Sequence, residues 1–519
     1  MRTFRDIFND LEEISKKEQF LEVVTYLSHK NLNCSVGELG KRDFNILLNE
    51  NEIIFLFGLW LKNFKNGKNV KITDIEKECV VVHKLMNELH STFIPEFKLD
   101  ESVRFEDFHI TQRNNPNILK EIIFYAGTGA YDFQYMDFLD KKYQLDKNWI
   151  SEKYGFELND VVDLFTIIKI GFNNRLNKNT YDSSNILELY RINISEPILK
   201  DNKKYIKILD LFSCNLNDDI NLNNSFSDIC DSNYFKIKPV IKTKNDYILP
   251  LPSLLATAFY ENFFYWMLED ESYEKKALNN RGLIAEKIVY DLISEKYSNV
   301  NIYKNIHVKE TKEKTITDLD ILLQKDDRLI IFQVKSKKLT ELSKQGNITK
   351  YEKDFNQAIS QAYEQAIRPY YHLYNQKCKL INNGTDLSIE RPNKIHSICV
   401  VLDSFPSLNT HIRLFYNIKK DTPIALSIFD LEIMLTFFDD INQLFDYLEI
   451  RNQMMGKLVS EEEISLLQAF LSNNIQQNNE YDFIYFDNSF AQKFDQTFYL
   501  PLLEKYYSKY QQIILKNYT

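Results

Sequence analysis

The spacing of hydrophobic and polar positions changes along this chain. Up to about residue 250, apolar residues recur every three to four positions, as in 20–27 and 80–89, which is the period of an amphipathic helix. From about residue 281 the pattern changes to helix, three strands, helix and strand, and after about residue 405 the helical period returns. The pattern therefore predicts a mixed α/β protein, in which an α/β core is flanked by a mainly α-helical N-terminal module and a helical C-terminal tail.

The elements expected in the core follow one another closely. We expect helices at 282–296 and 351–371 and strands at 300–308, 318–323, 329–335 and 395–403. A short polar turn at 325–328 separates the second strand from the third, so these two strands should pair as a hairpin.

The expected domain limits follow from one strong breaker in the middle of the chain. Two prolines within 249–252 interrupt the helical pattern, because proline disfavours helix at its own position and at the one before it. We therefore expect a mainly helical module over 1–265, the α/β core over 270–405 and a mainly helical region over 406–519.

Composition and charge narrow the class of protein. The chain has 519 residues, 44% of them hydrophobic and 27% charged, which is typical of a globular protein with more than one domain. Its longest apolar run, 53–61, is far shorter than the roughly 20 residues that span a bilayer. The first six residues already carry an acid and form no secretory signal, so we expect no membrane partner and a cytoplasmic location.

Cysteine spacing and net charge argue against three further classes. The six cysteines are scattered and contain no C-x-x-C pair, which argues against a structural zinc site and against a disulfide framework. The net charge of −10 argues against a protein covered in basic residues, although a local basic groove can still contact phosphates.

One cluster of polar residues stands out in the core. Asp318 and Asp320 lie on the second expected strand and share a face, because the side chains of a strand alternate. Gln333 and Lys335 share a face of the third strand in the same way. The hairpin should bring the acidic end of one strand beside the Gln-Lys end of the next. Glu286, on the preceding helix, falls on an apolar stripe, where a carboxylate is costly unless it is paired or bound to a metal.

These side chains suit phosphodiester hydrolysis. Carboxylates bind hard divalent cations, so we expect Mg²⁺ as the cofactor, with Mn²⁺ able to replace it. The expected ligands are Asp320, Glu286, Gln333 and Asp318, and we favour Asp320 over Asp318 because Asp320 directly precedes the apolar run 321–323. A bound metal polarises the phosphoryl oxygen and lowers the pKa of a bound water. The catalytic set is then Asp320, Gln333, Lys335 and Glu286, with Lys335 holding or deprotonating the water or stabilising charge on phosphorus.

At these residues the chain resembles the PD-(D/E)XK nuclease superfamily, which has the restriction-endonuclease-like fold. The resemblance covers about residues 275 to 405 and rests on an acidic helix residue, an Asp on the second strand and (E/Q)-x-K on the third. These positions are Glu286, Asp320 and the pair Gln333 and Lys335. Most members have Glu where this chain has Gln333, and a Gln there is similar to the Mrr-like restriction enzymes. The resemblance implies a Mg²⁺-dependent DNA endonuclease of bacterial restriction or anti-phage defence.

The resemblance also implies partners. The helical N-terminal module would sense a trigger or position the enzyme, through a protein partner or a homo-oligomer. Nucleic acid is the expected substrate, with DNA favoured over RNA. In this superfamily the helix after the motif often borders the active site, and we choose Gln361 from its glutamine stripe. Lys337 and Lys338 follow the motif in a lysine-rich segment, which can track a phosphate backbone or form an ordinary solvated loop.

A second hypothesis comes from a different class. The chain can also be a non-catalytic nucleic-acid-binding or scaffold protein built on a degenerate nuclease fold. Gln333 favours this alternative, because an amide gives a metal less charge than a carboxylate does. The intact Asp320 and Lys335 favour the enzyme.

Overall fold

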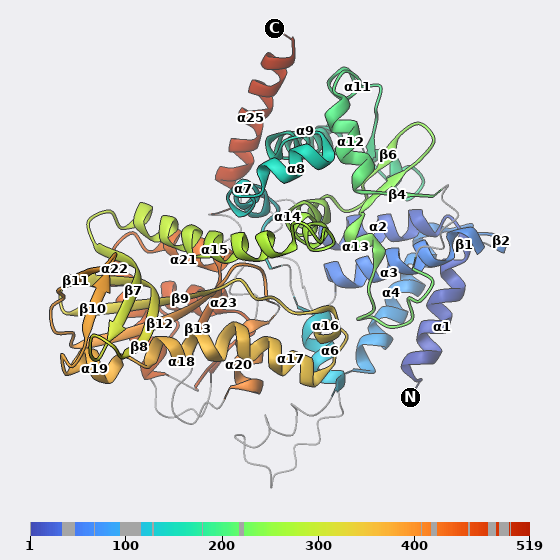
Figure 1. Cartoon of the computed structure of the whole chain (residues 1–519). Helices are drawn as coiled ribbons and strands as arrows, with labels where there is room; N and C mark the ends of the chain where they lie inside the picture. Colours follow the sequence, from blue (N-terminus) through green and yellow to red (C-terminus); the bar gives the residue numbers. More distant parts are fainter. Residues whose placement is uncertain are drawn as a thin grey trace. The chain divides into compact units, whose positions relative to one another are not determined.

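The computed structural model has a mixed α/β architecture with several sheets (Figure 1). It describes residues 2–33, 47–66, 68–93, 116–126, 129–178, 180–216, 223–405, 407–416, 423–454, 457–475, 484–486, 498 and 500–518. Two compact units divide the chain. The first comprises Met1–Glu101, Lys120–Ala277 and Asp495–Thr519, and the second comprises Ser102–Leu119 and Leu278–Phe494. The expected limit near 265–270 therefore differs from the observed one at Ala277, and the expected region 406–519 is shared between the two units.

The first unit is mainly helical. Its longer helices are α1 (Phe4–Ser15), α2 (Phe20–Leu32), α3 (Glu50–Asn63), α4 (Ile75–Ser91), α7 (Asp132–Lys142), α8 (Lys147–Tyr154), α9 (Leu158–Lys178), α12 (Lys203–Leu211), α14 (Pro252–Leu268) and α25 (Leu500–Tyr518). A small sheet that the pattern did not predict has the order β3-β6-β5-β4, with β3 at Arg191–Ile192, β4 at Ser213–Asn215, β5 at Val240–Lys242 and β6 at Tyr247–Ile248. These strands have only two or three residues, too few to show an alternating pattern in the sequence.

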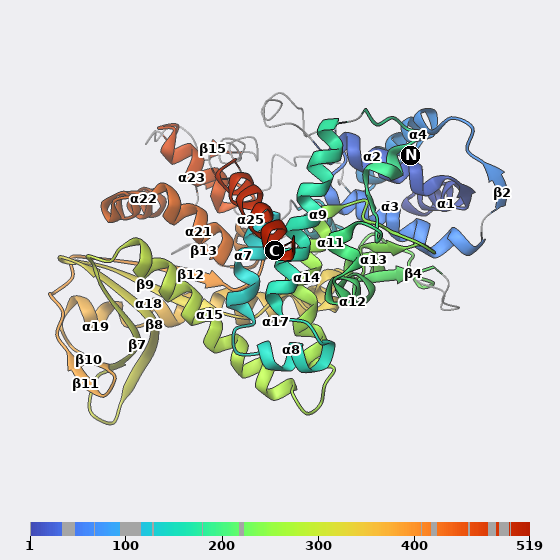
Figure 2. The same ribbon diagram turned by 90° about the horizontal axis from the view of Figure 1, so that it is seen from above.

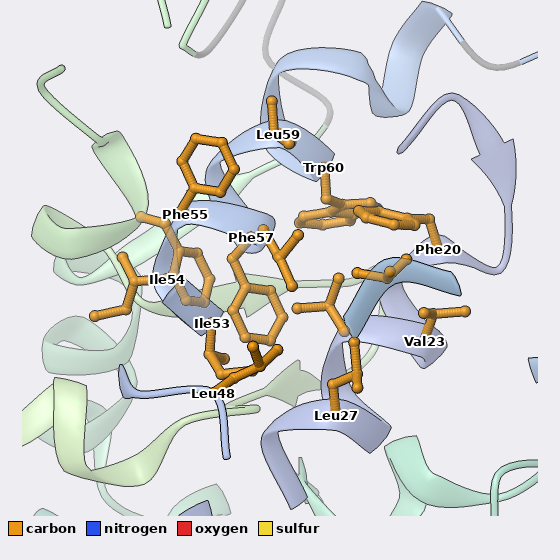
Figure 3. Packing of buried hydrophobic residues seen from close by; sticks show 14 of the residues in the cluster. Phe20, Val23, Leu27, Leu48, Ile53, Ile54, Phe55, Phe57, Leu59 and Trp60 are labelled. Carbon is orange, nitrogen blue, oxygen red and sulfur yellow. The ribbon is translucent and has the colours of Figure 1, made fainter. Parts of the chain in front are cut away.

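An apolar cluster holds the N-terminal helices of this unit together (Figure 3). The run 53–61 is α3, which is buried on nearly every side, and this explains why its sequence is continuously apolar. Phe57 and Trp60 of α3 and Phe20 of α2 all belong to this cluster, and all three are buried. The run thus forms the centre of a globular core.

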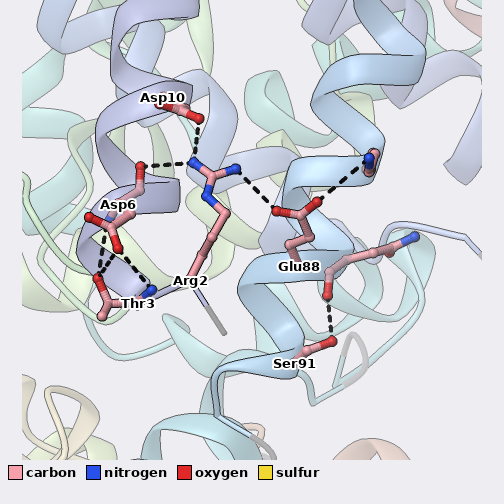
Figure 4. Close-up of polar contacts among 8 residues, drawn as sticks. Arg2, Thr3, Asp6, Asp10, Glu88 and Ser91 are labelled. Atoms are coloured by element: carbon pink, nitrogen blue, oxygen red, sulfur yellow. Dashed lines mark hydrogen bonds and ion pairs between the residues drawn. The ribbon is translucent and has the colours of Figure 1, made fainter.

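Polar contacts fix the start of α1 (Figure 4). Thr3 and Asp6 form a capping box, in which each side chain accepts from the other residue's backbone N–H. Arg2 pairs with Asp10 of α1 and with Glu88 of α4, the second pair at 3.2 Å. Arg2, which precedes α1, therefore contacts both α1 and α4. Exposed ion pairs of this kind add little to the free energy of unfolding.

The second unit is built on a seven-stranded sheet of order β11-β10-β7-β8-β9-β12-β13. Its strands are β7 (Asn301–Lys309), β8 (Thr315–Lys325), β9 (Arg328–Lys335), β10 (Lys379–Asn382), β11 (Thr385–Leu387), β12 (Lys394–Val401) and β13 (Ile424–Ser427). The strands β7, β8 and β9 pair antiparallel, and β9, β12 and β13 pair parallel. The four strands and the hairpin expected in the core are thus confirmed.

Helices lie on both sides of this sheet. Its first helix is α15 (Glu274–Lys296), and α18 (Gln361–Ile367) packs against β8, β9 and β12 on the opposite side (Figures 1 and 2). The helix α15 starts earlier than residue 282, because good helix formers precede Gly282 and a single glycine does not end a helix. The arrangement sandwiches the central strands between α15 and α18.

The single helix expected over 351–371 is interrupted. It consists of α17 (Ile348–Phe355), a π-helical turn (Asn356–Ser360) and α18, and Pro369 separates it from α19 (Tyr370–Tyr374). Proline lacks the N–H that a continuing helix needs, which accounts for the last break. A short helix α16 (Glu341–Lys344) comes before α17. The π turn shifts the rotational phase of everything that follows it.

The C-terminal part of this unit is helical with short strands. It contains α20 (Leu408–Phe415), α21 (Ile428–Phe437), α22 (Ile441–Gln453) and α23 (Glu463–Leu471), with β14 (Leu458–Val459) paired to β15 (Ile484–Tyr485). Ser427 and Asp430 form a capping box at the start of α21. Across the described parts of both units, no helix combines the length and apolar character needed to cross a membrane.

Candidate active site

The candidate site lies where β8 and β9 separate. Their pairing runs from Lys325 and Arg328 to Ile321 and Phe332 and stops there, at the level of Asp320. Beyond this point the Val334 N–H donates to Asp320 Oδ2 at 2.7 Å, so a side chain takes the place of a backbone partner. Backbone groups near a sheet interruption need such substitutes, because an unpaired buried N–H is costly.

Gln333 fills the space between the two separating strands. It is fully buried, and its Nε2 donates to the backbone oxygen of Asp318 at 2.9 Å. The other polar atom of its side chain, Oε1, is also buried and has no hydrogen-bond partner among the described residues. An unmet buried acceptor costs about 1 to 3 kcal/mol, so this oxygen is a candidate ligand for a cation or a water.

A residue of α18 holds the side chain of Lys335 in place. Its Nζ donates to Gln365 Oε1 at 3.2 Å, and Gln365 Nε2 donates to the backbone oxygen of Asp318 at 2.8 Å. The backbone oxygen of Asp318 thus accepts from both Gln333 and Gln365, which ties the two strands and the helix together. Lys335 is therefore placed by a side chain that the sequence had not singled out.

Glu286 reaches the same site from α15. The charges of Asp320 and Lys335 both act on its carboxyl group, which places the three groups within electrostatic range of one another. The apolar stripe expected for this helix is present, since Val289 and Ile293 are fully buried and Glu286 is half-buried. Within the described residues, the Glu286 carboxylate has no hydrogen-bond or ion-pair partner.

The two aspartates of β8 have different surroundings. Asp320 is half-buried and accepts a hydrogen bond from β9, whereas the side chain of Asp318 is 58% exposed and pairs with His307 on β7 at 2.6 Å. Asp318 is still close enough to act electrostatically on Asp320. The structure therefore brings Asp320, Glu286, Gln333 and Lys335 together, and Asp318 contributes to their arrangement mainly through its backbone oxygen.

Burial and like charge raise the pKa of both acids. The pKa of Asp320 is raised chiefly by burial, while the Val334 N–H and Lys335 oppose the shift and the Asp318 charge adds to it. The pKa of Glu286 is raised by burial and then by the Asp320 charge, against the opposing effect of Lys335. Two neighbouring carboxyls with raised pKa values are typical of catalytic and cation-binding sites.

Three oxygens of the site are candidates for holding a hard divalent cation. No group of three or more His, Cys, Asp or Glu side chains that could hold a metal occurs in the described part of the chain. The candidates are instead two carboxylates, Asp320 and Glu286, and the unpartnered Oε1 of Gln333. Mg²⁺ accepts this kind of set because it keeps several waters and needs only one or two carboxylates from the protein.

The residues expected to contact nucleic acid are placed differently. Lys337 forms an ion pair of 2.8 Å with the buried Asp354 of α17, so its ammonium group neutralises a carboxylate of the protein itself. Lys338 is half-buried and engaged with other parts of the protein. Gln361 is exposed on α18, and Gln365, one turn further on, makes the contacts to Lys335 and Asp318.

Comparisons with known proteins assign no family or function to this chain. No protein-family model, no curated protein and no solved structure matches the chain. The functional argument therefore rests on the side chains themselves.

The two glutamines of α18 provide a matched test of the site. Replacing Gln365 by Ala removes the acceptor that holds Lys335, and we expect nucleic-acid cleavage to slow by about tenfold because catalytic groups tolerate little misplacement. Replacing Gln361 by Ala changes the same residue type on the same helix, and we expect cleavage within twofold of the wild type. Initial cleavage rates at saturating Mn²⁺ compare the two variants, and equal rates would remove Gln365 from the site.

The raised carboxyl pKa values predict a gain of stability when one acid is neutralised. In the folded protein the pKa of Glu286 lies above its ordinary value near 4.5, so ionisation favours the unfolded chain and stability falls as pH rises through that window. Glu286→Gln should therefore raise the free energy of unfolding at pH 8 by a few tenths to about 1 kcal/mol without metal, since solvent screens a half-buried group. Denaturant unfolding at pH 8 and pH 4 measures this, and the gain should vanish at the lower pH.

Proposed function

We propose that this protein is a metal-dependent nuclease that hydrolyses phosphodiester bonds, with a restriction-endonuclease-like core in its second unit. The observation that carries the proposal is that Asp320, Glu286 and Lys335 lie within electrostatic range of one another, at the strand end where the buried Oε1 of Gln333 has no hydrogen-bond partner among the described residues. Phosphodiester hydrolysis uses oxygen ligands that hold a metal and a positive group that stabilises charge on phosphorus. The two carboxylates and the Gln333 oxygen can supply the first, and the Lys335 ammonium can supply the second. The strand order around them also supports the resemblance drawn from Glu286, Asp320 and the Gln333 and Lys335 pair.

Each residue has a distinct task in this proposal. Asp320, Glu286 and Gln333 Oε1 would hold Mg²⁺ or Mn²⁺, which when bound polarises a phosphoryl oxygen and lowers the pKa of a water. The Val334 N–H occupies Oδ2 of Asp320 and so fixes the orientation of its carboxylate. Lys335 is held by Gln365 beside both acids, where its ammonium group stabilises the negative charge that develops on the phosphoryl oxygens.

The substrate and biological role are proposed from the same resemblance. We propose DNA as the preferred substrate over RNA and a role in bacterial restriction or anti-phage defence, within the cytoplasm. The first unit, with its helices and its small sheet, would sense a trigger or position the substrate, through a protein partner or a second copy of the chain.

The direct test is cleavage with and without metal. Purified protein is incubated with supercoiled plasmid, linear duplex DNA, single-stranded DNA and RNA, each with Mg²⁺, with Mn²⁺ and with a chelator. We expect cleavage of at least the DNA substrates only where a divalent cation is present. Cleavage that persists in chelator would contradict the proposed chemistry.

A non-catalytic scaffold is the second candidate. No group of three or more His, Cys, Asp or Glu side chains that could hold a metal occurs among the described residues, which favours it. A scaffold would bind nucleic acid but leave every substrate intact with Mg²⁺ and Mn²⁺. Binding measured by fluorescence anisotropy, together with the cleavage assay, separates the two functions.

A further inference from the structure

A buried ion pair lies beside the candidate site, at the end of the strand that carries Lys335. Arg281 on α15 is 6% exposed and Asp403 is 3% exposed. The guanidinium donates from Nη2 to Asp403 Oδ2 and from Nε to the backbone oxygen of Ser336 at 2.8 Å. One side chain thus joins a helix to two separate positions of the chain.

Both of these positions lie at the ends of the parallel strands β9 and β12, of which β9 carries Gln333 and Lys335. Ser336 directly follows Lys335, the last residue of β9, and Asp403 lies two residues beyond the end of β12. The Leu402 N–H donates to the backbone oxygen of Lys335 at 3.0 Å, which holds the two strand ends together. The Arg281 guanidinium therefore connects α15 to the two strand ends at the level of Lys335.

The placement of α15 determines where Glu286 lies. Arg281 and Glu286 are five residues apart on this helix, which corresponds to roughly 7.5 Å along its axis and about 140° around it. Arg281 therefore points away from the direction of Glu286. Because the Glu286 carboxylate has no hydrogen-bond or ion-pair partner among the described residues, the position of its helix is what holds it near Asp320.

A buried ion pair fixes the relative position of two segments more reliably than it increases the free energy of unfolding. The cost of removing two charges from water roughly cancels their attraction, so an apolar pair of similar size would stabilise the fold equally well. The planar guanidinium, in contrast, bonds in fixed directions and can bind two acceptors at once. We infer that the Arg281–Asp403 pair is a positioning pair, which fixes α15 against the ends of β9 and β12 and thereby sets Glu286 opposite Asp320 and Lys335. This inference rests on the proposed nuclease function.

A second buried ion pair of the same unit provides a matched control. Arg451 of α22 binds Glu463 of α23 through Nε at 2.6 Å and Nη2 at 2.9 Å, and both residues are buried. The test variants are Arg281→Lys and Asp403→Asn, and the control variant is Arg451→Lys. A lysine keeps the charge but cannot bind two acceptors in fixed directions, and Asp403→Asn is the milder change in case Arg281→Lys does not fold.

The experiment measures three quantities on the 519-residue chain: Tm, Mn²⁺ affinity by calorimetric titration, and the single-turnover cleavage rate at saturating Mn²⁺. We expect some loss of Tm in all three variants, with the smallest loss in Asp403→Asn. Only Arg281→Lys and Asp403→Asn should need about tenfold more Mn²⁺ and cut about tenfold more slowly, because only they misplace Glu286. Arg451→Lys should bind Mn²⁺ and cut within twofold of the wild type.

The possible failures are distinguishable. A wild-type protein that neither binds Mn²⁺ nor cuts any substrate removes the proposed function, and the inference with it, before any variant is made. If the wild type is active, Mn²⁺ affinity and rate within twofold of the wild type in either folded test variant would overturn the positioning role. Equal losses in Arg451→Lys would also overturn it, because they would show a general effect of destabilising the unit.

Discussion

Lys335→Ala should abolish cleavage while leaving the fold intact, and this is the largest effect that we expect. The Nζ of Lys335 lies beside the acids Asp320 and Glu286 and is held by Gln365 at 3.2 Å. Removing a group that stabilises developing charge in a water-poor site costs about 100- to 1,000-fold in rate. We expect at least this loss at saturating Mg²⁺, with Tm close to that of the wild type because the residue is at a strand end.

The control for this prediction is a lysine of the same unit outside the site. Lys350 is exposed on α17, and Lys350→Ala should cut at nearly the wild-type rate. Circular dichroism and thermal unfolding establish that both variants fold. Full activity in Lys335→Ala at equal protein and metal would remove Lys335 from the mechanism.

The second large effect concerns the two aspartates of β8. Asp320→Asn should weaken Mn²⁺ binding by about 10- to 100-fold, because it removes one of two carboxylates from the proposed ligand set. Asp318→Asn should weaken it only about twofold, since its carboxylate is exposed and paired with His307, and its backbone oxygen is unaffected by the change. The same substitution two residues apart on one strand thus serves as its own control.

Calorimetric titration of Mn²⁺ into both variants and the wild type decides between these positions. Metal affinity should also rise with pH from the ordinary carboxyl range upwards, because protons compete for Asp320 and Glu286 and both pKa values are raised. Equal losses in Asp320→Asn and Asp318→Asn, or a larger loss in Asp318→Asn, would overturn the assignment of Asp320.

The central strands of the second unit were predictable because their signals are local. The alternation and the polar turn between β8 and β9 predicted a hairpin, and the pairing of Lys325 with Arg328 confirms it. The same period-two argument placed Gln333 and Lys335 at a strand end beside Asp320. It could not predict that pairing stops at Ile321, so the buried Oε1 of Gln333 and the bond from Val334 to Asp320 were not foreseen.

The choice between Gln361 and Gln365 could not be made from sequence. The two residues are one turn apart on the same stripe, and where a helix crosses a sheet decides which of them reaches the strands. The π-helical turn before α18 adds a further shift in phase. Lys337 was misleading for a related reason, because its buried partner Asp354 lies 17 residues further along the chain, on α17.

One missed hairpin did leave a signal in the sequence. The strands β10 and β11 are joined at Asn383 and Gly384, which have φ angles of 49° and 80°. An Asn-Gly pair with both φ angles positive is typical of a tight two-residue hairpin turn. The strand β13 gave no such signal, because it is four residues long, uniformly buried, and continuous with the start of α21.

The most direct test of the central claim is to locate the metal. Crystals of the wild-type protein soaked in Mn²⁺ are measured at a wavelength where manganese scatters anomalously, alongside crystals of Asp320→Asn. We predict an anomalous peak at bonding distance from the carboxylates of Asp320 and Glu286 and from Oε1 of Gln333, with the peak lost in the variant. A wild-type map without a peak among these three oxygens, from crystals of a protein that cuts DNA with Mn²⁺, would contradict the account.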